Sequence, residues 1–382
     1  MRRVIWGKKS HTINIFGDLI MAGTRPVIQT ASADVSTPLA ATLGVHLVAR
    51  RAFARFFLRQ RVCKRVYGCP MTDQHIQPDR ARGLRADLQS TVEEWSLMHF
   101  RGMIDHRLEK LMLKAGSDPV NLHRAMTYSL LTPGKRLRPL LTVLTSLHFG
   151  RRDLAALDVA CAIEMVHAAS LSMDDLPSMD NATVRRGQPT LHLAFGDDTA
   201  ILASVALLNQ AFETIVACKD LPSELRLDLM RLLTSAIGIN GLIGGQAMDL
   251  NLRSGTSRDE ELIKVNKLKT AALFAAAAEA GARIAGVNGK RLELVRQFAL
   301  ELGAAFQIAD DLLDDHAYAG KTGKDTGKDA NKPTLVSRNG IDDTRRKLQG
   351  HLTAALTCLD QTGSHDQRLR SLIDDGFSNF LS

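Results

Sequence analysis

The stretch TAALFAAAAEAGAR, residues Thr270–Arg283, decides the fold class of this chain. Alanine and leucine lose little side-chain freedom in a helix, so a run rich in them favours helix over strand. The 382 residues are 45% hydrophobic and only 5% aromatic, which is enough material to bury a large core. An all-α fold is therefore expected.

Helical spacing continues on both sides of this stretch. Apolar residues recur at steps of three and four from Phe100 to Met112, and Gly116 provides a stop. From about residue 85, this pattern predicts a single domain of roughly ten helices with no convincing strands. The other segments expected to be helical are 136–149, 153–175, 199–219, 224–243, 259–286, 291–315 and 341–361.

Positive charge is concentrated at the start of the chain. Residues 1–70 contain twelve lysines and arginines against two aspartates, a net charge of +10, so residues 71–382 carry −2 of the total of +8. We therefore expect no nucleic-acid partner, and we divide the chain into a basic leader (1–70) and a helical domain (71–382). The leader resembles an organelle transit peptide in composition, or it lies upstream of a true start at Met71.

Cysteine usage and hydropathy concern the compartment. The five cysteines are an odd number without CxxC spacing, which favours a reducing environment. We find no apolar run of the ~18 residues that a membrane span needs. A cytoplasmic protein without a transmembrane segment is expected, or one in a plastid or other organelle if the leader is a transit peptide.

Two aspartate clusters carry the strongest chemical signal. The first contains Asp174, Asp175 and Asp180 in MDDLPSMD, where Pro177 places the first two at a helix end. The second is ADDLLDD, in which Asp310 and Asp314 are one helical turn apart. Such close like charges are unfavourable unless a cation neutralises them, although a single acidic run would more often be a solvated helix end.

Lysines and arginines accompany both clusters. Arg185 and Arg186 follow the first one, and Lys321, Lys324, Lys328 and Lys332 follow the second. Carboxylates with nearby cations suit a substrate that is a magnesium diphosphate, since Mg²⁺ binds through one or two carboxylates, waters and phosphate oxygens. We therefore expect Mg²⁺ as the cofactor.

Two further features are weaker. The segment TPGKRLRP places Lys135, Arg136 and Arg138 at a helix start, which is a possible anion site, although exposed basic residues are common at such junctions. His167 lies seven residues before Asp174, about two turns away on the same helix face. A lone histidine among apolar residues is more often a core residue than a ligand, and this placement makes the two interpretations about equal.

The motifs together resemble those of the trans-prenyltransferases, or polyprenyl diphosphate synthases, and most closely the bacterial geranylgeranyl diphosphate synthases of carotenoid pathways. The resemblance covers residue 85 to the C-terminus. It implies an isoprenoid-synthase-type helical bundle around a central apolar cavity, and a homodimer. The matching motifs are GKRLRP (134–139), EMVHAASLSMDDLPSMDNATVRRGQPTLH (164–192), GGQAMDL (244–250), KLKT (267–270), FQIADDLLDD (306–315) and GKDTGKDANKPTLV (323–336).

The resemblance also implies roles for individual residues. Those matching the Mg²⁺-binding and catalytic aspartates are Asp174, Asp175, Asp180, Asp310, Asp311 and Asp314. Those matching the site for the allylic diphosphate are Arg185, Lys269, Thr270, Gln307, Lys324 and Lys332. Those matching the site for isopentenyl diphosphate are Lys135, Arg138, His167 and Arg186. Arg136, Lys321 and Lys328 have no assigned contact and contribute to the local field.

The implied activity is the condensation of isopentenyl diphosphate with an allylic diphosphate to give geranylgeranyl diphosphate. Ala169 and Ser170 lie four to five residues before Asp174 and are small, which leaves the pocket open to a long product. The alternatives are a farnesyl diphosphate synthase, a terpene synthase and an inactive partner subunit. A terpene synthase would leave GKRLRP, His167 and Arg186 without a substrate, and an inactive subunit should have lost part of an aspartate motif.

This chain departs from common family patterns in three places. The first is the basic leader, and the second is Ala182-Thr183, where acidic residues are frequent in the family. The third is Arg338-Asn339, where apolar residues are usual. None of these departures removes a matched motif residue.

Overall fold

A computed structural model describes residues 96–252, 259–314, 335–378 and 380, which all belong to one unit, Gln77–Ser382. Predictions about the leader, its boundary at residue 70, Lys321, Lys324, Lys328 and Lys332 lie outside the described residues. The side chain of Asp314 also lies outside them.

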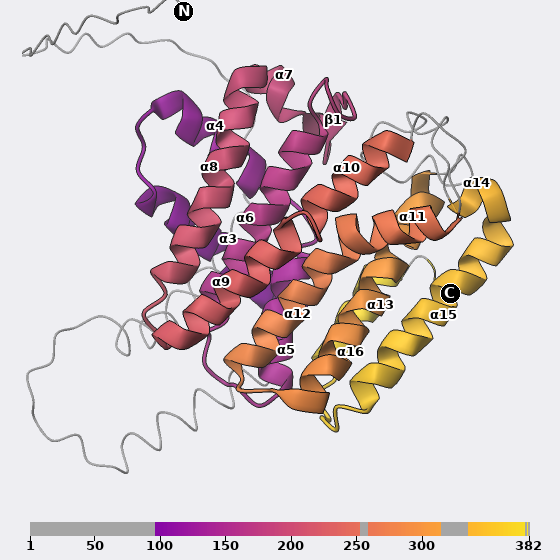
Figure 1. The fold of residues 1–382 in the computed structure, drawn as a ribbon. Coiled ribbons are helices and arrows are strands. Elements are labelled where there is room, and N and C mark those ends of the chain that lie inside the picture. Colours follow the sequence, from indigo (N-terminus) through magenta and orange to yellow (C-terminus); the bar gives the residue numbers. More distant parts are fainter. Residues whose placement is uncertain (1–95, 253–258, 315–334, 379, 381–382) are drawn as a thin grey trace, which may run out of the picture. The chain divides into compact units, whose positions relative to one another are not determined.

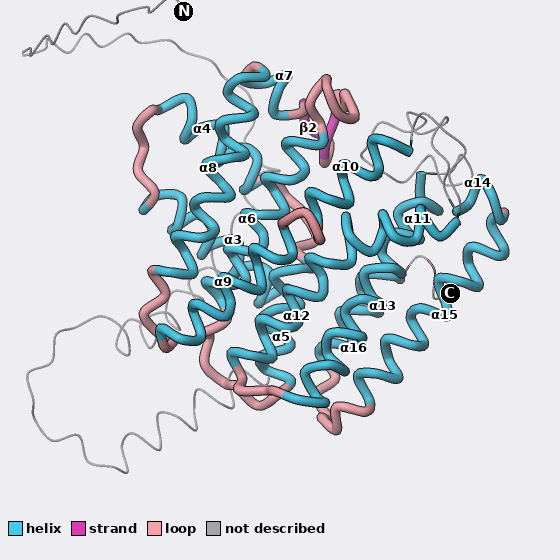
Figure 2. The backbone as a smooth tube through the Cα atoms, in the orientation of Figure 1, coloured by secondary structure: helices cyan, strands magenta, loops and turns pink. Residues whose placement is uncertain are grey.

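The described part is built almost entirely of helices, which confirms the predicted all-α class (Figures 1 and 2). The helices are α3 (Leu97–Lys114), α4 (Val120–Leu131), α5 (Leu137–His148), α6 (Leu157–Asp174), α7 (Leu191–Phe195), α8 (Asp197–Val216), α9 (Ser223–Ile237), α10 (Leu242–Leu252), α11 (Asp259–Asn266), the π-helix η1 (Lys267–Ala271), α12 (Ala272–Ile284), α13 (Gly289–Asp314), α14 (Leu335–Asn339), α15 (Ile341–Asp360) and α16 (Arg368–Phe377).

Six of these helices pack in a row. α8 packs on α6, α6 on α5, α5 on α12, α12 on α13, and α13 on α15 (Figure 1). The two central helices, α5 and α12, are buried on nearly every side. A helix that is apolar all round needs such a position, because no face of it can be left in water.

The contact between α5 and α12 depends on small residues. A Cβ atom at Gly281 would lie 2.2 Å from the carbonyl oxygen of Thr142 and 3.0 Å from the Cβ of Thr145. The alanine-rich stretch that indicates a helix in the sequence therefore also allows two central helices to approach closely. This close packing fixes α5, whose first turn carries part of the candidate site.

Helix boundaries differ from the predicted segments in two places. The segment expected at 224–243 is interrupted at Gly238, and α10 begins at Leu242. The segment expected at 259–286 contains η1, where the chain widens into a π-helix. A π-bulge inside an α-helix is frequent at functional sites. The helices α4, α7, α14 and α16 were not predicted, because they are short or weakly periodic in sequence.

The described residues also include one small β-hairpin. β1 (Val184–Arg185) pairs antiparallel with β2 (Gln188–Pro189). The two connecting residues, Arg186 and Gly187, have φ angles of 53° and 76°. Positive φ at both central residues is typical of a type I′ turn, the geometry that joins two antiparallel strands most tightly. The hairpin holds both arginines of the RRG motif.

Two helical stretches, Asp197–Val216 and Ser223–Leu252, are long and apolar enough to cross a membrane by length and composition alone. Core helices of soluble proteins pass the same test, so these stretches establish no membrane span. Of their most apolar windows, 39% and 28% is buried within the structure.

Candidate active site

The first aspartate cluster has the predicted form, since α6 ends at Asp174 and Asp180 lies in the loop that follows. This loop folds back onto the helix end. The backbone N–H of Asp180 donates to the carbonyl of Asp174 at 2.9 Å, and that of Ala182 donates to the carbonyl of Asp175 at 3.2 Å. These bonds satisfy carbonyls that a helix C-terminus leaves free, and they keep the three aspartates on one short, ordered segment.

Asp175 is paired inside the protein. Arg185 on β1 donates from Nε and Nη2 to Asp175 Oδ1 at 3.0 and 2.5 Å. Burial raises the pKa of Asp175, and the hydrogen bonds from Arg185 oppose this rise. Asp175 is 2% exposed, so its visible role is to hold the hairpin against the end of α6.

Asp174 has a different environment. Burial raises its pKa to about 6, the nearby charge of Lys269 lowers it, and the charge of Asp180 raises it further. The charged form of Asp174 is thus disfavoured in the free protein. A cation between Asp174 and Asp180 would remove this penalty.

The second cluster lies at the end of α13 beside the π-helix. Lys269 on η1 forms an ion pair of 2.6 Å with Asp249 on α10. Thr270 donates to Gln307 Oε1 at 2.8 Å, and Gln307 donates to Asp311 at 2.9 Å. The structure therefore brings Lys269, Thr270, Gln307 and Asp311 together, and Asp310 lies next to them along α13.

The basic segment forms the entry to α5. Arg136 caps the helix with a left-handed backbone, φ 51°, and Pro139 lies in the first turn. Lys135 is exposed, whereas Arg136 and Arg138 are buried. The simple alternative of an exposed basic cluster at this junction is wrong for these two arginines.

Arg138 is a buried cation without a carboxylate hydrogen-bonded to it in the described part of the chain. Its Cζ lies 4.5 Å from the ring centre of Phe274 and 5.8 Å from that of Phe306. Its Nε has no hydrogen-bond partner among the described residues. Burial lowers its pKa to about 10, with the charge of Arg186 adding to this effect and that of Glu164 opposing it. An anion would satisfy this group.

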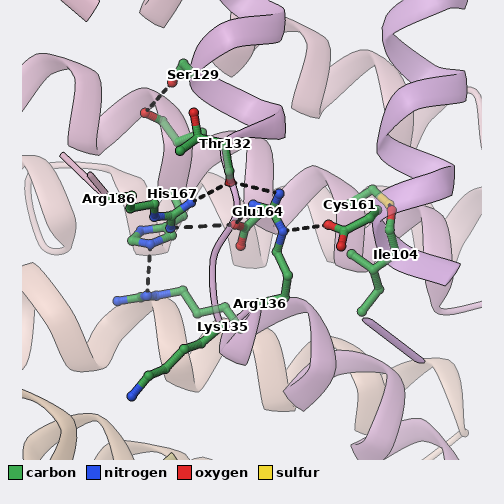
Figure 3. Close-up of polar contacts among 12 residues, drawn as sticks. Ile104, Ser129, Thr132, Lys135, Arg136, Cys161, Glu164, His167 and Arg186 are labelled. Atoms are coloured by element: carbon green, nitrogen blue, oxygen red, sulfur yellow. Dashed lines mark hydrogen bonds and ion pairs between the residues drawn. The ribbon is translucent and has the colours of Figure 1, made fainter. Parts of the chain in front are cut away.

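His167 lies against Arg138, with 3.3 Å between its Nε2 and Arg138 Nη1 (Figure 3). Burial lowers the pKa of His167 well below its ordinary value, and the surrounding arginines lower it further. The imidazole is therefore neutral at physiological pH, and its Nε2 accepts a hydrogen bond from Arg138.

The hairpin and the basic segment interlock. Arg186 Nη1 donates to the carbonyl of Thr132 at 3.3 Å. A Cβ at Gly134 would lie 2.8 Å from Arg186 Cζ, so a larger residue here would displace the guanidinium group. The structure thus brings together three predicted residues, Arg138 in the first turn of α5, His167 within α6 and Arg186 in the hairpin. The fourth, Lys135, lies in the segment that leads into α5.

The two residues predicted to control product length lie in different surroundings. Ala169 is 1% exposed and is part of the packed core. Ser170 is half-buried, and its hydroxyl donates to the carbonyl of His167 at 2.9 Å. Ser170 therefore lies one turn from both His167 and Asp174 on the same part of α6.

The sequence analysis missed three carboxylates: Asp105, Glu164 and Asp249. Glu164 and Asp105 pair with Arg136, and Asp249 pairs with Lys269. Glu164 precedes His167 by three residues, and Asp249 is in GGQAMDL, so position within a motif could have suggested both. Asp105 gave no such signal.

The donor set fits a hard divalent cation. The side chains at both clusters are carboxylates, which Mg²⁺ prefers. Among the described side chains, no three His, Cys, Asp or Glu groups converge closely enough to hold a metal ion unaided. Mg²⁺ does not need such a cage, because it keeps waters and takes phosphate oxygens as ligands.

Known proteins resemble this chain over most of its length. The sequence model of the family described as "Polyprenyl synthetase" matches residues 119–373. The chain is 44% identical over 257 residues to geranylgeranyl diphosphate synthase from Pseudescherichia vulneris, covering 67% of this chain and 82% of that protein. It is 36% identical over 321 residues to the enzyme of the same name from Pantoea ananas, covering 82% and 98%.

Farnesyl diphosphate synthase from Geobacillus stearothermophilus is also similar, at 42% identity over 241 residues, 62% of this chain and 81% of that protein. Among solved structures, geranyltransferase from Legionella pneumophila matches with a TM-score of 0.67 and 27% identity, over 74% of this chain and 96% of that one.

The geranyltransferase from Helicobacter pylori, solved with magnesium and isoprenyl diphosphate, matches with a TM-score of 0.62 and 27% identity, over 81% and 98%. Family, relatives and fold thus agree, and the chain belongs to the polyprenyl synthetase family, as a trans-prenyltransferase.

Proposed function

We propose that the protein condenses isopentenyl diphosphate with an allylic diphosphate and releases geranylgeranyl diphosphate. The observation that carries this proposal is the presence of two chemically different ends of one helical site. One end gathers buried arginines with an unsatisfied guanidinium, and the other gathers aspartates at the ends of α6 and α13. Two diphosphates, one of them bound through metal, match these two ends.

The aspartate end suits the allylic diphosphate. Asp174, Asp180 and Asp310 would hold Mg²⁺, as would Asp311 and Asp314, with Asp175 acting mainly through Arg185. Lys269, Thr270 and Gln307 lie beside them and would contact the same diphosphate, with Lys324 and Lys332. When bound, Mg²⁺ supplies positive charge that stabilises the diphosphate as it leaves.

The arginine end suits isopentenyl diphosphate. Arg138 and Arg186 offer fixed guanidinium groups that match phosphate geometry, and the exposed Lys135 adds a mobile cation. Neutral His167 aligns Arg138 through the contact at Nε2. An anion bound here would replace solvent around Arg138 and supply the partner that its Nε lacks.

The chain's own groups then account for the chemistry. Lys269 and Arg185 stabilise negative charge that develops on the departing diphosphate, and the apolar helices exclude water that would capture the allylic cation. The isopentenyl double bond, held in place by its diphosphate in the arginine end, attacks that cation. The released diphosphate takes the proton, since no described side chain among the motifs is an obvious general base.

Relatives favour the C20 product, because the two geranylgeranyl diphosphate synthases above are 44% and 36% identical to this chain. The farnesyl synthase at 42% identity supports a C15 product as the second candidate. The test is to incubate the purified protein with labelled isopentenyl diphosphate, Mg²⁺ and dimethylallyl, geranyl or farnesyl diphosphate, and to size the products. Elongation of farnesyl diphosphate to C20 is expected, and products that stop at C15 would establish the second candidate.

We also propose that the protein is a cytoplasmic homodimer that uses the outer face of α8. Ile201, Leu202, Val205 and Val216 on this helix are 42%, 59%, 55% and 53% exposed. Such a row on an otherwise core-forming helix is a candidate interface. Val205→Glu should lower the mass measured by light scattering to that of a monomer. Leu113→Glu, at a leucine on α3 that is 78% exposed, should leave the mass unchanged.

A further inference from the structure

Glu164 is a buried carboxylate at the centre of the arginine end. It lies on α6 one turn before His167 and is 1% exposed. Its Oε1 is 2.6 Å from Arg136 Nη1 and 4.0 Å from Arg186 Nη2 (Figure 3). Two arginines from separate segments thus face the same oxygen.

The guanidinium group of Arg136 is hydrogen-bonded within the protein. Its Nε donates to Asp105 at 2.8 Å, its Nη1 to Glu164 at 2.6 Å, and its Nη2 to the carbonyl of Thr132 at 3.2 Å. Its side chain is 2% exposed, and all three of its nitrogens already donate to acceptors within the protein. Of the three cations in the basic segment, Arg136 is therefore the one that anchors the segment.

The anchor determines where the neighbouring cations lie. Arg136 adopts the left-handed region, which is unfavourable for a residue with a side chain and persists only where the surroundings fix it. Lys135 and Arg138 flank this strained residue, and Lys135 points away from the Arg136–Glu164 pair (Figure 3). Loss of the anchor would let the backbone relax and move both cations.

The same anchor reaches the hairpin. The carbonyl of Thr132 accepts hydrogen bonds from both Arg136 and Arg186. Glu164 lies beneath both arginines, and its charge also favours the protonated forms of Arg138 and Arg186. The only other carboxylate paired with Arg136 in the described part of the chain, Asp105, is half-exposed at the edge.

We propose that Glu164 is the positioning residue of the isopentenyl diphosphate subsite, holding the Arg136 loop and the Arg186 hairpin in one binding geometry. This inference rests on the proposed function. The competing interpretation is a purely structural buried ion pair, which would affect stability but not one substrate in particular.

The test is Glu164→Gln, with steady-state kinetics for both substrates. We expect the KM for isopentenyl diphosphate to rise roughly ten- to a hundredfold, because a charge-assisted contact that fixes two arginines is lost. The KM for the allylic diphosphate should change by less than about threefold, since Glu164 has no contact with the aspartate end. A parallel rise in both KM values, or no rise, would overturn the inference.

Glu279→Gln is the matched control. Glu279 is also a buried carboxylate, paired with Arg283 at 3.3 Å and Arg296 at 3.5 Å on the far part of α12 and on α13. This variant should lose comparable stability in a thermal melt while both KM values stay unchanged. A selective rise in the KM for isopentenyl diphosphate in this control would overturn the inference. It would show that losing a buried carboxylate affects this KM wherever the carboxylate lies.

A second variant covers the case in which Glu164→Gln does not fold. Asp105→Asn weakens the outer contact of Arg136 and keeps Glu164, so it should produce a smaller rise in the same KM alone. The absence of any selective rise overturns the inference. A wild-type protein that consumes no isopentenyl diphosphate overturns the proposed function itself, and the positioning role with it.

Discussion

The arginine end and the aspartate end of the site differ in the sign of the charge that they bury. At the arginine end, Arg136, Arg138 and Arg186 are gathered over a single buried carboxylate, Glu164, and positive charge is left over. At the aspartate end, burial raises the pKa of Asp174 to about 6, and the charge of Asp180 raises it further.

The difference shows how each end is completed. At the arginine end, hydrogen bonds already hold Arg136, Arg138 and Arg186 before any ligand binds, and an anion would complete the site. At the aspartate end, the charges of Asp174 and Asp180 disfavour each other, and the proposed diphosphate would need cations in order to bind there. Binding at the first end should therefore be independent of metal, and binding at the second should depend on it.

The largest expected effect is at the aspartate end. Asp174→Ala or Asp310→Ala should leave the helical domain folded but lower kcat roughly a hundredfold or more, because each removes a carboxylate proposed to hold Mg²⁺ and metal charge stabilisation is worth several kcal/mol. Rates across a magnesium titration, with circular dichroism for folding, are the measurement. Asp228→Ala at an exposed position on α9 is the control. Wild-type rates and metal dependence in Asp174→Ala would remove the metal assignment.

A smaller effect should come from Asp249, the counterpart of Glu164 at the aspartate end. Asp249 holds the ammonium group of Lys269 at 2.6 Å, and Asp249→Asn would release it. The KM for the allylic diphosphate should rise about tenfold, the typical cost of losing a charge-assisted contact. The KM for isopentenyl diphosphate should stay within about threefold. If both Asp249→Asn and Glu164→Gln raised the same KM, the two ends would not be separate sites.

The next prediction concerns Ala169 and Ser170, the two residues predicted to control product length. Replacing Ala169 by Phe or Tyr should shift the main product from geranylgeranyl to farnesyl diphosphate by shortening the pocket. Ala169 is packed in the core, so this change should also cost about 1–3 kcal/mol of stability through overpacking. Ser170→Phe, at the half-buried neighbour, should shift the product with a smaller loss of stability. Unchanged C20 product in both variants would place the pocket floor on another helix.

The sequence predicted the fold class and the ends of the main helices because apolar spacing and proline positions are local signals. Asp174 at the end of α6 and Asp180 in the following loop are examples. It did not predict the π-helix at Lys267–Ala271, which packs on α10 and α13. It also did not predict the break at Gly238, because apolar residues continue on both sides of this glycine. A Cβ at Gly245 would lie 2.4 Å from the backbone nitrogen of Lys269, a constraint visible only in three dimensions.

The site shows the same division. Residues in linear motifs were found, but the partners that fix them were not. Arg136 had no assigned contact, and the structure shows why it is present: it pairs with Asp105 and Glu164, which are 31 and 28 residues away in sequence. Nothing local to GKRLRP indicates such partners, because pairing over that distance is decided by helix packing.

The smallest expected effect is on folding stability, whose dependence on pH should have opposite signs at the two ends. His167 at the arginine end has a folded pKa well below its ordinary value of 6.5. As the pH falls below about 6.5, the unfolded chain gains a proton that the folded protein does not, so stability falls. Asp174 at the aspartate end has a folded pKa of about 6, raised from 3.8. As the pH falls through 6, the folded protein gains the proton first, so stability rises.

Without divalent metal, the two slopes should oppose each other between pH 6.5 and 5, each by up to about 1.4 kcal/mol per pH unit. His167→Gln leaves the slope of Asp174, so this variant should gain stability on acidification relative to wild type. Asp174→Asn leaves the slope of His167, so this variant should lose stability on acidification relative to wild type. Urea unfolding at several pH values measures both, and shifts common to all three proteins, such as those of Asp175 and His148, cancel in the differences. Slopes of opposite sign are expected only if the arginine end disfavours an added positive charge and the aspartate end disfavours an added negative charge. Equal slopes in the two variants would therefore mean that the two ends do not differ electrostatically.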